Sequence, residues 1–124
     1  MGKKLQGVFY TTTTGKSPVE EWINNQSVKI QAKMLRYMDL LETHCDQGPF
    51  RFVRNLGDGL YEIKAEIDNA WPRIVYFYYD KGHIIYLHGF LKKQNKTPRK
   101  EVNTANSRRN DYICRREKKN ETKT

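Results

Sequence analysis

Hydrophobic and polar positions alternate in the middle of the chain with the period of β-strands. In residues 61–67 the odd positions are apolar or aromatic and the even positions are charged, as in a strand with one buried face. Residues 73–79 and 83–88 are rich in β-branched and aromatic side chains, which favour strands. A short turn at residues 80–82 separates them. We therefore expect three consecutive strands that pair as an antiparallel sheet.

A helical period precedes these strands. Ser17 and Pro18 are a capping residue and a first-turn proline, which predict a first helix that ends near residues 24–25. A second helix is predicted over residues 27–44, where apolar side chains recur at intervals of three and four. The two helices should form a hairpin that covers one face of the sheet and leaves the other face partly open.

The apolar face of the second predicted helix is wide. Two adjacent stripes make it up: Val28, Ala32, Leu35 and Met38, and then Ile30, Met34, Tyr37 and Leu41. Both stripes are expected to pack against the sheet. We therefore place Leu35 in the core, together with Tyr76 from the second of the three strands.

Turn-forming and charged residues predict the rest of the chain. A short strand at residues 5–10 comes first, and residues 46–59, with three glycines and one proline, are expected to be a loop. A basic loop at residues 92–96 leads into a last helix over residues 98–114. The charged residues 115–124 lack apolar side chains and are expected to be disordered. The element order is typical of an α+β fold.

The charge of the chain indicates the kind of partner, whereas its length indicates only the number of domains. The chain has 124 residues, which fits one domain over residues 1–114 and a short basic tail. It has 23 Lys and Arg against 14 Asp and Glu, a formal net charge of +9, and fifteen of the cations lie in residues 63–124. Such a basic half favours a polyanionic partner, either nucleic acid or an acidic protein segment. The alternative is that the charge serves solubility alone.

Several other classes of function lack the residues they need. No apolar run is long enough to span a membrane, and no apolar segment follows the basic residues near Met1, so we expect neither a membrane protein nor a signal peptide. Cys45 and Cys114 have no metal-ligand spacing, as in the reduced thiols of a cytoplasmic protein. Glycine-rich phosphate loops and the serine-nucleophile elbow are also absent from the sequence.

RNA cleavage needs none of these groups, because the 2′-hydroxyl of RNA can attack the adjacent phosphate. The enzyme must remove the hydroxyl proton, stabilise the added negative charge and protonate the leaving oxygen. A lysine among other cations suits the first task, since nearby positive charge lowers its pKa. An arginine suits the second, since it stays charged. Candidate bases are Lys64, Lys93 and Lys96, and Arg73, expected on an exposed sheet face, is the candidate phosphate clamp, although each lysine can equally be a solvated surface charge.

The three histidines are weaker candidates for this chemistry. His44 lies near the end of a predicted helix and His83 follows a turn, and both positions favour structural roles. His88 lies in an apolar strand, where a hydrogen-bonded structural histidine is the more common case.

Three segments resemble the phage-related HigB toxins of the RelE superfamily. Residues 59–64, Gly-Leu-Tyr-Glu-Ile-Lys, are similar to the family's Gly-Leu-Tyr/Trp-Glu-Leu-Arg stretch, and residues 73–76 are similar to its following strand. Residues 88–98, His-Gly-Phe-Leu-Lys-Lys-Gln-Asn-Lys-Thr-Pro, give the most specific match. The resemblance extends over about residues 8–113, and its closing helix is matched by Ala105, Arg109, Asp111 and Tyr112.

The resemblance implies a RelE-like α+β fold and a type II toxin–antitoxin system. Toxins of this family cleave mRNA, commonly on the ribosome, without a metal or organic cofactor. A cognate antitoxin, usually a helix-turn-helix protein, holds them inactive, and operator DNA is bound only through the toxin–antitoxin complex. A non-catalytic RNA- or ribosome-binding module and an inhibitor of a host protein remain alternatives on the same fold.

The resemblance maps the family's basic and polar sheet residues onto Lys64, Arg73, Lys93 and Lys96, which are therefore predicted to be catalytic. Other basic residues are predicted to contact RNA: Lys92, Arg99, Lys100 and Arg109. Lys64 stands where the family usually has arginine. The lysine keeps the positive charge but loses the bidentate fork that grips phosphate.

Overall fold

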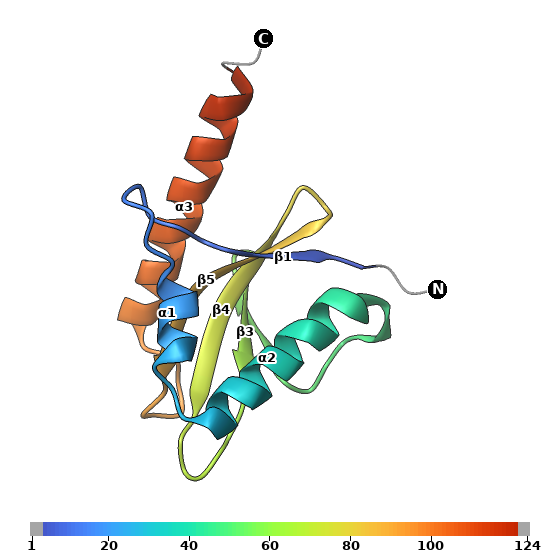
Figure 1. Ribbon diagram of the computed structural model, residues 1–124, viewed down its shortest axis with the longest axis vertical. Helices are drawn as coiled ribbons and strands as arrows, with labels where there is room; N and C mark the ends of the chain where they lie inside the picture. Colours follow the sequence, from blue (N-terminus) through green and yellow to red (C-terminus); the bar gives the residue numbers. More distant parts are fainter. Residues whose placement is uncertain (1–3, 122–124) are drawn as a thin grey trace.

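The computed structural model describes residues 4–121, which form one five-stranded sheet with helices on both faces (Figure 1). In chain order the elements are β1 (Gln6–Phe9), α1 (Pro18–Asn24), α2 (Val28–Thr43), the 3-10 turn η1 (Cys45–Gln47), β2 (Val53–Gly57), β3 (Leu60–Lys64), β4 (Pro72–Tyr79), β5 (His83–Leu91) and α3 (Arg99–Glu121). In this part of the chain no helix is both long and apolar enough to cross a membrane. The α+β fold is therefore confirmed.

The strands lie in the order β1-β5-β4-β3-β2. The prediction that β3, β4 and β5 are antiparallel neighbours is confirmed. The strand β1, however, lies at one edge and runs parallel to β5, with Gln6 opposite His83 and Phe9 opposite Tyr86. The sheet is therefore mixed and not antiparallel throughout. Parallel pairing is possible because the long connection through both helices and three strands brings the chain back in its original direction.

The opposite edge of the sheet is β2, which falls inside the segment expected to be a loop. This strand is short, has one neighbour and exposes Arg54 and Asn55, so its alternation of apolar and polar residues is weak. Gly57, Asp58 and Gly59 have φ values of 92°, 54° and 82°, which form the tight turn into β3. The glycines of this segment thus mark the end of a strand.

The two faces of the sheet are covered by different helices, and each has its own core. On one face lie α1 and α2, as predicted (Figure 1). Buried side chains of this first core are Val19, Ile23, Ile30, Met34, Met38, Leu41, Ile63, Ile74, Tyr76, Ile84 and Tyr86. Successive strand residues point to opposite faces, and α3 packs over the second face, which is therefore covered in part. Buried side chains of this second core are Tyr10, Leu60, Val75, Phe77, Ile85, Leu87, Phe90 and Ala105.

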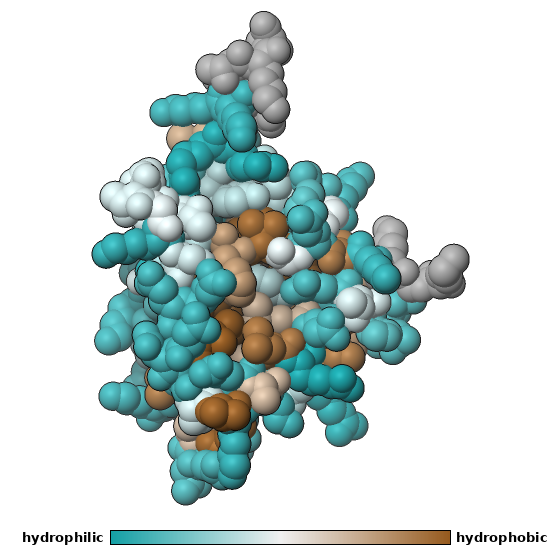
Figure 2. All heavy atoms as spheres, in the orientation of Figure 1, coloured by the Kyte–Doolittle hydropathy of each residue, from teal (hydrophilic) through white to brown (hydrophobic). Residues whose placement is uncertain are grey.

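The second of the two apolar stripes of α2 packs against the sheet, and the first stripe is buried only at Met38. Ile30 and Met34 are buried, whereas Val28 is 82% and Leu35 is 48% exposed. The prediction for Tyr76 is confirmed and that for Leu35 is wrong, because the side chain of Leu35 lies outside the part of α2 that contacts the sheet. Figure 2 shows exposed apolar atoms between α1 and α2 and further ones toward β1, among atoms that are mostly hydrophilic.

The last helix is longer than the sequence suggested. It continues past Cys114 to Glu121, so the expectation of disorder is wrong for residues 115–121. Arg115 explains part of this: it pairs with Asp111 at 2.8 Å, lies 5.5 Å over the ring of Tyr10 and donates a hydrogen bond to the Thr11 carbonyl. The end of α3 projects beyond the sheet (Figure 1). The remaining part of the predicted tail, residues 122–124, lies outside the described residues.

Candidate functional site

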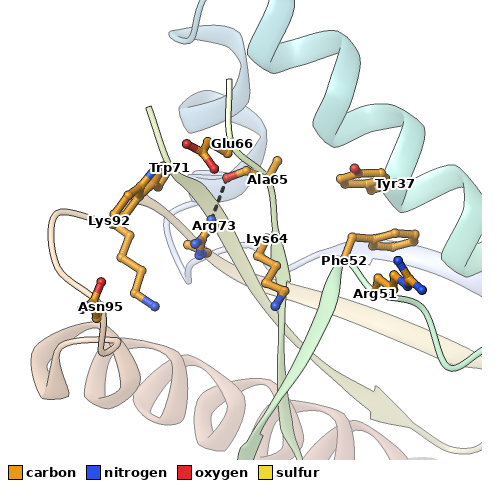
Figure 3. Close-up of a pocket in the computed structure, with 10 residues that line it drawn as sticks. All are labelled: Tyr37, Arg51, Phe52, Lys64, Ala65, Glu66, Trp71, Arg73, Lys92 and Asn95. Atoms are coloured by element: carbon orange, nitrogen blue, oxygen red, sulfur yellow. Dashed lines mark hydrogen bonds between the residues drawn. The ribbon is translucent and has the colours of Figure 1, made fainter. Parts of the chain in front are cut away.

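A groove of about 530 Å³ opens where β3 ends, β4 begins and the chain leaves β5. Its walls combine four cations, one carboxylate and three aromatic rings (Figure 3). The lining residues are Tyr37, Arg51, Phe52, Lys64, Ala65, Glu66, Trp71, Arg73, Lys92 and Asn95. A concentration of positive charge in one hollow suits a phosphate-bearing ligand.

Strand register brings the central cations of this groove together. Lys64 on β3 lies opposite Arg73 on β4, and paired residues of antiparallel strands point to the same face. Lys92 follows the end of β5, and its backbone N–H donates to the Trp71 carbonyl at 2.8 Å. Lys64 and Lys92, which are 28 positions apart in the chain, therefore lie in the same groove at one end of the sheet.

Arg73 is held in place by a buried acidic partner. Glu62 is 0% exposed, and its Oε1 lies 3.4 Å from Nε of Arg73. Thr97 donates to the other carboxylate oxygen of Glu62 at 2.8 Å, and Nη1 of Arg73 donates to the carbonyls of Ala65 and Pro72 at 2.8 and 2.9 Å. Glu62 is one of the charged even positions of residues 61–67, and it lies on the face of the second core, where Thr97 covers it.

The expectation that Arg73 lies exposed is wrong, since it is only 9% exposed. Burial lowers the pKa of Arg73, and the charge of Glu62 opposes that shift. Its guanidinium still lines the groove (Figure 3). Arg73 therefore has two roles: it pairs with the buried Glu62, and it brings a positive charge to the groove.

Lys92 has the most unusual environment of the groove lysines. It is 8% exposed, and burial lowers the pKa of its ammonium group. The charges of Arg54, Arg73 and Lys64 lower that pKa further, while Glu62 raises it. A lysine in such a setting releases its proton more readily than a surface lysine does.

The other cations chosen from the sequence lie outside this groove. Lys93 is exposed and is not part of the groove lining. Lys96 and Arg99 line a neighbouring hollow of about 490 Å³, to which β2 contributes Arg54. Lys100 is exposed on the first turn of α3. The structure thus brings Lys64, Arg73 and Lys92 together and separates them from the remaining lysines.

Arg109 has a structural position instead. It donates to the Asp58 carbonyl at 2.6 Å and to the side chain of Asn106 at 2.7 Å, so it ties α3 to the turn between β2 and β3. Its guanidinium also lies 6.0 Å from the ring centre of Phe77.

His88 is hydrogen-bonded on both ring nitrogens, which confirms the structural interpretation. Nε2 lies 2.9 Å from Glu101 and Nδ1 lies 3.2 Å from Arg108, and the ring stacks on Phe90. Burial lowers the pKa of His88, with Glu101 opposing and Arg108 adding to the shift.

Sequence reasoning missed the aromatic walls and one cation of the groove. Tyr37 was assigned to the core, and its ring stacks on Phe52 at 4.0 Å with an interplanar angle of 3°. Arg51 and Phe52 lie in the segment expected to be a loop, and Trp71 lies between two predicted strands. The only available signal was that arginine and aromatic residues alternate at residues 50–52.

These features define a small α+β domain with a RelE-like arrangement: a helical hairpin on one face, a C-terminal helix on the other, and a basic groove at one end of the sheet. The family described as "Phage derived protein Gp49-like (DUF891)" matches residues 21–110. The chain therefore belongs to the Gp49-like family of phage-derived proteins. No curated protein matches the chain.

Proposed function

We propose that this protein is the toxin of a type II toxin–antitoxin system, of the HigB type, and that it cleaves mRNA by metal-independent acid–base chemistry. Membership in the Gp49-like family supports the proposal, because that family is associated with RelE- and HigB-like toxins. The single observation on which the chemistry depends is the buried Lys92, which lies among the charges of Lys64 and Arg73. Its site of action would be the cytoplasm, where mRNA and ribosomes are found.

The proposed reaction needs one proton acceptor and a set of fixed positive charges. Neutral Lys92 takes the proton of the RNA 2′-hydroxyl, whose oxygen then attacks the adjacent phosphorus. Arg73 and Lys64 stabilise the negative charge that develops on the phosphate oxygens. The bond to the 5′-oxygen breaks, and this oxygen takes the proton back from Lys92. The products are a 2′,3′-cyclic phosphate and a 5′-hydroxyl, and no proton is consumed.

This mechanism changes some of the roles predicted from the sequence. Lys92 was assigned to RNA contact and becomes the proposed base, while Lys64 and Arg73 stay in the catalytic set. Lys93 and Lys96 are better suited to contact the RNA strand beyond the groove, because they are exposed beside it. The non-catalytic RNA-binding alternative has one observation in its favour: Nη1 of Arg73 is already engaged by two carbonyls.

The same basic surface would bind the antitoxin of this system. A helix-turn-helix antitoxin with an acidic segment would neutralise the groove and exclude RNA, and the complex would contact operator DNA through the antitoxin. Co-expression with the cognate antitoxin is therefore expected to restore growth.

The test is controlled expression in bacteria of the wild type, Lys92→Ala and the control Lys81→Gln, with growth curves and mapping of mRNA 5′ ends. Lys81 is exposed in the β4–β5 turn, at the far end of β4 from the groove. Growth arrest with new 5′ ends is expected for the wild type and Lys81→Gln but not for Lys92→Ala. Arrest without new ends would indicate a ribosome- or protein-binding inhibitor instead, and no arrest by the wild type would refute the toxin.

A further inference from the structure

Trp71 differs from the other aromatic residues of the groove. Tyr37 and Phe52 stack on each other, whereas no aromatic or cationic side chain among residues 4–121 stacks on the half-buried indole of Trp71. The indole nevertheless lines the groove (Figure 3). A large apolar ring left partly open inside a basic hollow is available to a ligand.

The backbone fixes Trp71 firmly. Ile67 and Ala70 exchange two backbone hydrogen bonds, at 2.9 and 2.8 Å, around a turn whose central residues have φ values of 50° and 68°. That tight turn extends the β3–β4 hairpin up to Trp71. The Trp71 carbonyl accepts the bond from Lys92, and Pro72 begins β4. The backbone that carries Trp71 therefore needs little ordering when a ligand binds, which favours affinity.

The neighbours of Trp71 indicate which ligand chemistry fits. Figure 3 shows the indole on one side of the groove, close to the Lys92 stem and Glu66, with Arg73 and Lys64 toward the middle. Cations that hold phosphate beside an aromatic face are the combination that binds single-stranded nucleic acid, because every base offers a π-face. Glu66 repels phosphate, but its carboxylate can accept a hydrogen bond from an amino group on a base edge.

We propose that Trp71 is the platform on which an unpaired nucleobase stacks, next to the phosphate held by Arg73 and Lys64. The inference rests on the proposed function for the identity of the ligand as RNA. It adds that the bound strand must be locally single-stranded, since a base inside a duplex has both faces covered. It also makes Trp71 the residue that sets the register of the strand against Lys92.

Fluorescence provides a direct test, because the chain has two tryptophans. The variant Trp22→Phe leaves Trp71 as the only one, and Trp22 lies away from the groove, packed over Gly89. The probe is a single-stranded oligonucleotide with 2′-O-methyl groups, which cannot be cut by 2′-hydroxyl attack. Quenching of Trp71 is expected with this strand and not with an abasic strand of the same length. Equal quenching by both strands, or none with the base-bearing strand, would overturn the proposal.

A second measurement does not depend on how Trp22→Phe folds. Trp71→Leu and Trp71→Phe in the otherwise wild-type chain are compared for affinity to the same 2′-O-methyl strand. Stacking on one base is typically reflected in about a tenfold change, so Trp71→Leu should bind about tenfold more weakly, with Trp71→Phe between the two. The abasic strand should bind all three proteins alike. An unchanged affinity of Trp71→Leu for the base-bearing strand would also overturn the proposal.

The two proposals can fail separately in these experiments. Because the probe cannot be cleaved, quenching together with no mRNA cleavage would leave the stacking platform in place and refute the ribonuclease. Cleavage of mRNA by the wild type, with no effect of Trp71→Leu on binding, would support the ribonuclease and refute the stacking platform.

Discussion

Glu62 and Arg73 form an ion pair in the interior of the domain, with 3.4 Å between Oε1 and Nε. Neither of these two atoms has a hydrogen bond in the described structure, whereas Nη1 of Arg73 and Oε2 of Glu62 do. Both charges have lost most of their contact with water, so each depends on the other for compensation. The ion pair of Glu62 and Arg73 therefore contributes to the stability of the fold, although Arg73 also lines the groove.

The first prediction follows from this pair. Arg73→Ala should lower the free energy of unfolding by about 3–5 kcal/mol, because it leaves the carboxylate of Glu62 buried and uncompensated. Urea unfolding of the wild type, Arg73→Ala and the control Lys93→Ala, a substitution at an exposed neighbour, measures the effect. An Arg73→Ala midpoint equal to that of the wild type would show that the pair is not needed. A loss of activity in Arg73→Ala is therefore informative only alongside this measurement.

The second prediction concerns the pH dependence of cleavage. Burial and the neighbouring cations lower the pKa of Lys92 below the ordinary lysine value of about 10.4. The proposed base must be neutral, so the single-turnover rate should rise with pH and level off at that lowered pKa. Lys92→Arg keeps the charge but cannot deprotonate, and it should lose about 10²–10⁴-fold in rate with no such rise. Wild-type activity in Lys92→Arg would exclude Lys92 as the base.

The third prediction concerns stability in acid. Burial lowers the pKa of His88 in the folded state below the value of 6.5 for an exposed histidine. As the pH falls below that value, the unfolded chain takes up a proton that the folded chain does not, so stability should decrease. Above it both states are neutral and His88 contributes no pH dependence. Thermal melts of the wild type and His88→Gln between neutral and acidic pH should show a smaller decrease for the variant. Parallel curves would assign the acid sensitivity to other groups.

The fourth prediction separates the two stripes of α2. Met34→Ala should destabilise the protein by about 2–5 kcal/mol, because Met34 is fully buried in the first core. Leu35→Ala, at the next position of the same helix, should change stability by about 0.5 kcal/mol or less. Urea midpoints give the comparison directly. Similar losses in both variants would mean that the exposed stripe is covered in solution.

Local pattern predicted much of this fold. The alternation in residues 61–67, the turn at residues 80–82 and the helical period of residues 27–44 each identified an element that the structure contains. These features depend on neighbours in the chain. The parallel pairing of β1 depends on a partner far away in sequence, and nothing in residues 5–10 specifies its direction.

The candidate site was predictable only in part, for a similar reason. Lys64 and Arg73 were found because they lie on strands whose register follows from one hairpin. The burial of Lys92 arises from contacts across the fold, and a run of lysines in the sequence does not show which one is covered. Trp71 was overlooked because an aromatic residue in a connection leaves no periodic signal.

The pairing of β1 with β5 has a consequence for synthesis of the protein. The first strand emerges from a ribosome long before its partner, and it has to wait until residues 83–86 have left the exit tunnel. Lys92 and then α3 follow later still. Domains generally fold as units during translation, at about 5–20 residues per second. A nascent chain therefore spends seconds without a complete groove, and an RNA-cutting site would first exist only after Lys92 has left the exit tunnel.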